Sequence, residues 1–208
     1  TVVTSQLQRV VAERYGGVYY ETLTGFKNIA AVMREIEEDP PRGQFVIGDE
    51  ESYGYLIGTE VRDKDSITAT LLTIEMALYH RSQGKTVLDR LNELYREYGY
   101  YEELAISKYF RGQAGKEIMN GMMADIRKDM PKQFGGSAVV TAVDLQEDSE
   151  IDMQTGKSAP GPGLPKSNVL QLFLANGGKV SMRPSGTEPK IKFYASCHGE
   201  PGEDLESA

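Results

Sequence analysis

The chain has 208 residues and is therefore long enough for one large domain or two modest ones. Hydrophobic residues make up 39% and charged residues 26%, which are ordinary values for a globular protein. Its 31 acidic and 23 basic side chains give a net charge of -8, which argues against a broad nucleic-acid-binding or anionic-membrane surface. The single Cys197 excludes an internal disulfide, and no apolar run reaches the roughly 18 residues that a membrane-spanning helix needs. We therefore expect a cytoplasmic protein that binds neither nucleic acid nor membrane.

The first half of the chain alternates helical and extended patterns. Apolar residues recur at helical spacing in four segments, which are Leu7 to Val11, Phe26 to Ile36, Ile67 to Leu78 and Leu88 to Tyr98. Thr86 and Asp89 form a capping-box pattern at the start of the last one. Short strands are predicted at Val18–Tyr20 and Phe45–Ile47. This alternation predicts βαβ units, and hence a Rossmann-like α/β domain with a mostly parallel sheet, over residues 1–112.

The second half reads as a smaller α+β domain with an antiparallel sheet, over residues 113–208. A helical stripe from Ile118 to Met130 is rich in methionine, which is typical of a packing surface and less often of a partner-binding groove. Strand patterns follow at Val139–Val143, Val169–Leu174, Lys179–Met182 and Ile191–Ser196. Asn176-Gly177-Gly178 is typical of a hairpin turn, and Ala159 to Gly163 is predicted to be a loop.

The loop between the last two predicted strands reads Arg183-Pro184-Ser185-Gly186-Thr187-Glu188-Pro189-Lys190. The planar fork of Arg183 can meet two oxygens of a phosphate, Ser185 and Thr187 can each donate a hydroxyl proton, and Lys190 or Lys192 can add a positive charge. Gly186 allows the backbone to approach a ligand closely. The residues therefore indicate an anion-binding site, and the alternative is a polar hairpin loop with a solvated arginine.

An acidic loop follows the predicted strand that ends at Ile47. Ligands of open α/β sheets collect beyond the carboxyl ends of the strands, where Asp49, Glu50, Glu51 and Ser52 stand. Carboxylates accept protons from sugar hydroxyls in fixed directions, and a serine both donates and accepts. The residues alone leave two alternatives open, because three neighbouring carboxylates also suit a solvated loop or a divalent metal.

Three segments in order resemble one family. R-P-S-G-T-E-P-K-I-K resembles the phosphate-binding loop in the last domain of the α-D-phosphohexomutases, the phosphoglucomutase and phosphomannomutase superfamily. Upstream, Thr24-Gly25-Phe26-Lys27 resembles the T-G-[FW]-K turn of that family's third domain. Gly48 to Tyr55, followed by Arg62-Asp63-Lys64-Asp65, resembles its sugar-recognition loop. The resemblance runs from Thr24 to Lys192 and covers most of the chain.

The resemblance implies a role for each matching residue. Glu50 and Ser52 would hold two adjacent ring hydroxyls, while Lys64 and the Thr24-Gly25 turn would contact the sugar phosphate or ring oxygens. The phosphate-binding residues it implies are Arg183, Ser185, Gly186, Thr187 and Lys192. Asp49 departs from the hydrophobic residue often found at its position, but its side chain has no assigned role in sugar binding.

The family's phosphoserine loop, which resembles T-A-S-H-N-P, and its magnesium loop, which resembles D-G-D-x-D-R, do not occur in this sequence. Both belong to the family's first two domains. The resemblance therefore implies a C-terminal fragment with most of domain 3 and all of domain 4, whose partners are a sugar phosphate and the N-terminal domains of the same polypeptide. Mg²⁺ and a sugar bisphosphate activator are implied for the full-length enzyme only. We expect this chain to bind substrate and not to turn it over.

The implied activity is interconversion of sugar 1-phosphate and 6-phosphate through a phosphoserine and a bisphosphorylated sugar. Tyr53-Gly54-Tyr55-Leu56 and Arg62-Asp63-Lys64-Asp65 resemble the phosphoglucomutase and phosphopentomutase branch more than the phosphomannomutase branch. The alternative is a stand-alone, non-catalytic module that binds phosphate or a sugar phosphate. Thr155-Gly156-Lys157-Ser158 is not a nucleotide-binding P-loop, because Ile151 stands where that motif requires its first glycine.

Overall fold

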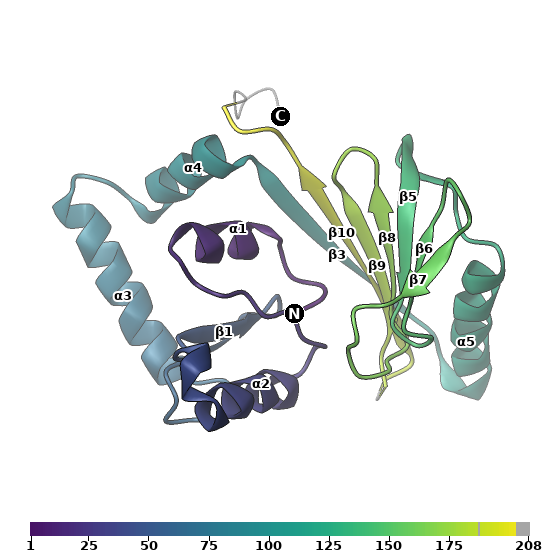
Figure 1. Cartoon of the computed structure of the whole chain (residues 1–208), viewed down its shortest axis with the longest axis horizontal. Coiled ribbons are helices and arrows are strands. Elements are labelled where there is room, and N and C mark those ends of the chain that lie inside the picture. Colours follow the sequence, from purple (N-terminus) through teal and green to yellow (C-terminus); the bar gives the residue numbers. More distant parts are fainter. Residues whose placement is uncertain (187, 203–208) are drawn as a thin grey trace. The chain divides into compact units, whose positions relative to one another are not determined.

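The computed structural model describes residues 1–186 and 188–202, which form two compact units (Figure 1). The first unit comprises Thr1–Tyr100 together with residues 199–202, and the second comprises Tyr101–His198. The assignment of residues 1–112 and 113–208 to two functional domains stays a prediction. No helix in the described part of the chain is long and apolar enough to span a membrane.

The first unit combines helices with one β-hairpin. Its elements are α1 (Leu7–Arg14), α2 (Phe26–Glu38), the 3-10 helix η1 (Pro40–Arg42), β1 (Ile47–Glu50), β2 (Gly54–Ile57), α3 (Ser66–Ser82) and α4 (Val87–Tyr98). The helices confirm the predictions from apolar spacing. The capping box of α4 is also confirmed, because the Asp89 N–H donates to Thr86 Oγ1 at 3.1 Å and the Thr86 N–H donates to Asp89 Oδ2 at 2.7 Å.

The core of the first unit lies between α2 and the hairpin. Phe26, Ile29 and Met33 follow one another at helical spacing and are buried against Leu56 of β2, with Phe45 packed beside them. β1 and β2 pair in antiparallel register, with Ile47 opposite Ile57 and Glu50 opposite Gly54. This packing fixes the start of α2 next to the turn of the hairpin, which is where the sequence predicts sugar recognition.

The predicted Rossmann-like parallel sheet is wrong. All strand pairs within residues 1–186 and 188–202 are antiparallel. Only three residues separate β1 from β2, and so short a connection permits antiparallel pairing alone. Parallel strands are buried on both faces, whereas Val46 is 71% exposed and Val18 is 70% exposed. Residues 18–23 carry no assigned strand, and α3 keeps its apolar residues exposed.

The second unit is a long antiparallel sheet with one helix. Its elements are β3 (Tyr101–Tyr109), α5 (Gly112–Lys128), β4 (Gln133–Phe134), β5 (Ser137–Asp144), β6 (Ser149–Asp152), β7 (Ser158–Pro160), β8 (Leu170–Leu174), β9 (Lys179–Pro184) and β10 (Lys190–His198). The strand order is β3-β10-β9-β8-β5-β6-β7, and β4 pairs with β5. The antiparallel α+β architecture is confirmed, as is the hairpin at Asn176 to Gly178 between β8 and β9.

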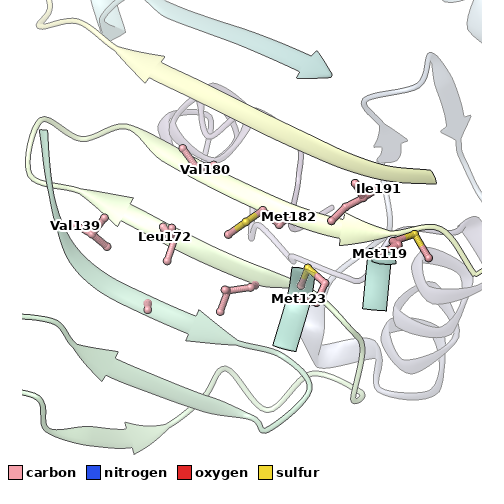
Figure 2. Packing of buried hydrophobic residues seen from close by; sticks show 9 residues of the cluster. Met119, Met123, Val139, Leu172, Val180, Met182 and Ile191 are labelled. Atoms are coloured by element: carbon pink, nitrogen blue, oxygen red, sulfur yellow. The ribbon is translucent and has the colours of Figure 1, made fainter. Parts of the chain in front are cut away.

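The core of the second unit lies between α5 and one face of the sheet. Met119 and Met123 of α5 are buried, and Figure 2 shows them beside residues of β9 and β10, among them Met182 and Ile191. The packing role predicted for the methionine stripe is therefore confirmed for Met119, whereas the buried Met123 was not among the residues predicted to form the stripe. Ile118, which was included in the same stripe, is exposed because it lies on another side of the helix.

Four strands of the second unit, among them the two-residue β4, were not predicted. β3 and β6 gave no clear strand pattern, and β7 covers the first part of the segment predicted as a loop at Ala159 to Gly163. All but the first residue of β3 are exposed on both faces, so the strand lacks the alternation of apolar and polar residues that marks a half-buried strand. β3 nevertheless pairs with β10 along its whole length, from Tyr101 opposite His198 to Tyr109 opposite Lys190.

Candidate functional site

Glu50 and Gly25 meet at the turn end of the first unit's hairpin. Glu50 is the last residue of β1, and Gly25 is the N-cap residue of α2. The Glu50 side chain accepts a hydrogen bond from the Gly25 N–H. Gly25 has a φ of 112°, which L side chains rarely adopt, so a glycine is needed for this turn. Two residues that are 25 positions apart in sequence, both predicted to contact sugar, are thus brought into direct contact.

Lys64 lies beside the same turn. Its ammonium is 5.2 Å from the centre of the Phe26 ring and donates to Asp63 Oδ1 at 2.7 Å. Its aliphatic stem passes over Gly54, where an added Cβ would be 3.1 Å from Lys64 Cδ and 2.7 Å from the Phe26 ring. The hydrogen bond to Asp63 raises the pKa of Lys64, and the negative charge of Glu50 acts in the same direction. Lys64 therefore stays protonated close to Glu50.

The remaining predicted sugar contacts lie on the two turns themselves. Ser52 is exposed in the turn between β1 and β2, and its hydroxyl donates to Glu51 at 3.3 Å. Thr24 precedes Gly25, and its carbonyl accepts from Asn28 Nδ2 at 2.9 Å. Tyr53 follows Ser52 with a φ of 64° and 89% of its surface exposed. The first unit therefore gathers Gly25, Glu50 and Lys64, with Ser52 and Thr24 on adjoining turns.

The acidic loop is not arranged as a metal site. Asp49 accepts from Gln8, Glu50 accepts from Gly25, and Glu51 accepts from Ser52, so the three carboxylates are held by different partners. Within the described residues no group of three or more His, Cys, Asp or Glu side chains is placed to hold a metal ion. The magnesium that the family resemblance implies therefore finds no fitting donor set in this part of the chain.

The second candidate site lies where β9 ends and β10 begins. Arg183 stands directly opposite Lys192 in the antiparallel ladder, and Ser107 of β3 stands opposite Lys192 on its other side. Directly opposite residues share one face of a sheet, so two cations and a hydroxyl form a row. Neither cation forms an ion pair with a carboxylate in the described part of the chain. An anion is the group that would offset their mutual repulsion.

The turn between these strands is held by its own hydrogen bonds. The Ser185 N–H donates to the Lys190 carbonyl at 2.8 Å, and the Glu188 N–H donates to Ser185 Oγ at 3.2 Å. Gly186 is exposed, and apart from its chain neighbours no atom of the described residues lies within 4 Å of the place where its Cβ would be. The chain is therefore open toward solvent at this predicted phosphate contact. Thr187, which the sequence also predicts to bind phosphate, lies outside the described residues.

Lys190 differs from Lys192 in its surroundings. Its ammonium forms an ion pair with Glu188 and lies 5.5 Å from the centre of the Tyr109 ring. The hydrogen bond to Glu188 and its negative charge raise the pKa of Lys190. The charge of Lys190 is thus offset by Glu188. The Lys192 ammonium instead lies 5.7 Å from the centre of the Tyr194 ring. Lys192 as the phosphate-binding lysine stays a prediction.

Ser107 is the candidate that sequence reasoning missed. It lies on β3, a strand with no clear pattern, and only the register of the ladder places it beside Lys192. Phe26 and Asp63, which hold Lys64, were also unassigned, although both lie inside the quoted motifs. The sequence identifies the segments of a site more readily than the neighbours that orient its side chains.

The chain matches a family model and is similar to known phosphoglucomutases. Residues 1–98 match the family model described as phosphoglucomutase/phosphomannomutase, alpha/beta/alpha domain III. The chain is 36% identical over 198 residues to a phosphoglucomutase of Staphylococcus haemolyticus, with 95% of this chain and 35% of that protein covered. It is 36% identical over 199 residues to a phosphoglucomutase of Staphylococcus aureus, with 94% and 35% covered. The chain thus spans about a third of the length of these relatives.

The fold is also similar to a solved structure. This is the crystal structure of the exocytosis-sensitive phosphoprotein pp63/parafusin, a phosphoglucomutase of Paramecium, in an open form. The TM-score is 0.60 at 17% sequence identity, with 98% of this chain and 33% of that chain covered. That likeness concerns the fold alone. Together, the match to the domain III model and the identity to the bacterial phosphoglucomutases show that the chain belongs to the phosphoglucomutase/phosphomannomutase superfamily.

Proposed function

We propose that this chain is the substrate-binding part of a phosphoglucomutase-like isomerase and corresponds to the third and fourth domains of that enzyme. The named phosphoglucomutases of Staphylococcus support this, because they match nearly the whole chain and extend well beyond it. The full-length enzyme would interconvert a sugar 1-phosphate and a sugar 6-phosphate through a phosphoserine and a bisphosphorylated intermediate. It would work in the cytoplasm.

The observation that carries this proposal is the contact between Glu50 and the start of α2, with Lys64 beside it. In the proposed role the Glu50 carboxylate and the Ser52 hydroxyl bind two adjacent hydroxyls of the sugar ring. A carboxylate has two oxygens, so one can hold the Gly25 N–H while the other accepts from the sugar. Lys64 and the Thr24-Gly25 turn would contact phosphate or ring oxygens of the substrate.

The row of Arg183 and Lys192 supports the phosphate-binding part of the proposal. The Arg183 guanidinium can bind two phosphate oxygens at once, and Lys192 adds a second positive charge. Ser185, Gly186 and Thr187 would supply hydroxyl and backbone donors from the turn. Such contacts act by orienting the substrate and stabilising its charge, not by taking a proton from it.

This chain by itself would bind substrate without turning it over. It lacks strings resembling the family's phosphoserine and magnesium loops, so no residue here is proposed as the group that transfers phosphate. Magnesium and a sugar bisphosphate activator belong to the proposal for the full-length enzyme only. Glucose phosphate is the proposed substrate, in keeping with the names of the relatives, with mannose or pentose phosphates as the alternatives.

Substitution Glu50→Gln tests the sugar-binding assignment. The amide keeps the size of the side chain and an oxygen for the Gly25 N–H, but it removes the charge that strengthens hydrogen bonds from sugar hydroxyls. Calorimetric titration is expected to show roughly tenfold weaker binding of glucose 1-phosphate, as for the loss of about 1.5 kcal/mol, and unchanged binding of inorganic phosphate.

The matched control is Asp49→Asn, which makes the same charge change at the neighbouring carboxylate held by Gln8. It is expected to leave both affinities unchanged. An equal loss in the two variants, or an equal loss for both ligands, would show that Glu50 acts through general charge and not by binding the sugar.

A further inference from the structure

The edge strand β3 is long, exposed and apolar at its centre. It is the terminal strand of the second unit's sheet, and β10 is its partner on one side. Leu104 is 58% exposed and Ile106 is 54% exposed, on a face that they share. Long exposed edges of this kind are templates for pairing with another strand, and natural proteins usually block or cover them.

The hydrogen bonds at the two ends of β3 show which of its backbone N–H and C=O groups point toward β10. The Tyr100 carbonyl accepts from the Gly199 N–H at 2.8 Å, and the Phe110 N–H donates to the Pro189 carbonyl at 2.7 Å. Hydrogen-bonded positions alternate along an antiparallel ladder, so the even-numbered residues of β3 bond to β10. The N–H and C=O groups of Glu103, Ala105 and Ser107 therefore point away from β10, and none of them bonds to another residue in the described part of the chain.

We propose that β3 pairs with β3 of a second copy of this chain, antiparallel and about a two-fold axis at Ala105. In this register residue i of one copy faces residue 210 minus i of the other, so each outward-pointing N–H meets an outward-pointing C=O. Ala105 faces Ala105, Glu103 faces Ser107, and Tyr101 faces Tyr109. Each copy presents the same segment to the other, as an isologous interface requires.

The side chains complement one another in the same register. On one face Glu102 lies opposite Lys108 of the other copy, and Leu104 lies opposite Ile106. The symmetric pair therefore has four apolar residues at its centre and an oppositely charged pair at each end. Opposite charges and apolar residues placed directly across a ladder both stabilise it. Lys108 has no ion pair within the described residues, so its charge is available for this contact.

Neighbouring registers lose this match. A shift by one residue would place outward-pointing backbone groups opposite groups already bonded to β10. A shift by two residues in either direction keeps the backbone match but places Glu102 opposite Ile106, or Lys108 opposite Leu104. The charges then face apolar side chains and the central apolar cluster is broken. One register thus satisfies both the backbone and the side chains, and this favours a second copy as the occupant of the edge.

Charge reversal tests the pairing. Glu102→Lys and Lys108→Glu each place like charges opposite one another at both ends of the symmetric pair. Analytical ultracentrifugation of the 208-residue chain is expected to show a concentration-dependent dimer, and each single variant is expected to weaken it by about tenfold. Mixing the two variants restores opposite charges across the interface, so a heterodimer should form, as should a dimer of the double variant. Lys166→Glu, an equal charge change at an exposed residue outside β3, should leave the dimer intact.

Proline substitution tests the backbone contact separately. Ala105→Pro removes an N–H that points away from β10, and edge strands tolerate proline at such a position. The variant is expected to be monomeric with unchanged circular dichroism, which distinguishes loss of pairing from loss of folding. The proposal is overturned if the chain is a monomer at all concentrations up to about 1 mM, a range that reaches weak affinities. It is equally overturned if a dimer survives both Ala105→Pro and the single charge reversals.

Discussion

Arg183 and Lys192 are two like charges placed opposite each other on neighbouring strands. Such a pair opposes folding, because like charges directly across a ladder repel. Neither residue has a neutralising carboxylate in the described part of the chain, whereas Lys190 two positions away is paired with Glu188. A local arrangement that costs stability is typical of functional sites, where a ligand supplies the missing charge.

Arg183→Ala is expected to change stability and binding in opposite directions. Phosphate binding should weaken by about 1.5 to 3 kcal/mol, the range for hydrogen bonds to charged groups. The ligand-free chain should be slightly more stable, by up to about 1 kcal/mol, because the repulsion with Lys192 is removed. Calorimetric titration with inorganic phosphate measures the first effect, and urea unfolding without ligand measures the second.

Lys190→Ala provides the control for that pair of measurements. Since Lys190 is held by Glu188, its removal should weaken phosphate binding much less than the removal of Arg183. If Arg183→Ala leaves phosphate binding unchanged, or if Lys190→Ala weakens it more, the assignment of the loop is wrong.

At the scale of elements, an ion pair joins α5 to the sheet. Arg127 Nε and Nη2 donate to the two carboxylate oxygens of Asp144 at 2.7 Å and 3.1 Å, and the Asp144 side chain is 5% exposed. The Gln146 N–H also donates to Asp144. A buried carboxylate without its partner is strongly destabilising, so the pair matters most when one member is removed.

Arg127→Met should therefore lower the free energy of unfolding by roughly 3 kcal/mol, at the low end for broken buried pairs. The double variant Arg127→Met with Asp144→Asn should recover a large part of that loss, because the amide carries no charge and can still accept from the Gln146 N–H. Urea unfolding measures both variants. A double variant that is no more stable than Arg127→Met would show that lost packing, and not the unpaired charge, causes the effect.

The capping box of α4 predicts a pH dependence. Hydrogen bonds from the Thr86 N–H and then the Thr86 hydroxyl lower the pKa of Asp89 below its ordinary value of 3.8. A carboxyl with a lowered folded-state pKa contributes stability above its unfolded-state pKa, and this stability is lost as the pH falls through the folded-state value. The contribution of Asp89 is thus present at neutral pH and disappears in acid below 3.8.

Thr86→Ala should move the titration midpoint of Asp89 upward, because it removes the hydroxyl donor, and Thr86→Ser should leave the midpoint low. Carbon-detected NMR of the Asp89 carboxyl follows this directly. Equal midpoints in the wild-type chain and in Thr86→Ala would contradict the capping role of the hydroxyl.

The helices were predictable because their signals are local. The spacing of Phe26, Ile29 and Met33 and the capping box at Thr86 both act within a few residues. The sheet of the first unit was not predictable in the same way, since strand pairing depends on distant partners. Residues 45–47 read as a central strand, yet the three-residue turn after Glu50 leads β1 into an antiparallel hairpin.

The same difference between local sequence signals and contacts with distant residues holds for the candidate site. Motifs identified the segments around Glu50 and Arg183, but the contact of Glu50 with Gly25 and the row formed by Arg183 with Lys192 follow from the fold. The strand register also placed Ser107 in that row, where no motif indicated it. Residue identity therefore predicts which chemistry is available, and pairing decides which groups act together.

For the whole molecule, the central claim is that the chain recognises a sugar ring with one loop and a phosphate with another. The most direct test is an amide-resolved NMR titration of the chain with glucose 1-phosphate and, separately, with inorganic phosphate. We expect both ligands to shift amides between Arg183 and Lys192, and glucose 1-phosphate alone to shift Gly25 and the residues from Glu50 to Tyr53. Identical shifts for the two ligands, confined to the loop at Arg183, would contradict sugar recognition, and the absence of shifts at that loop would contradict phosphate binding.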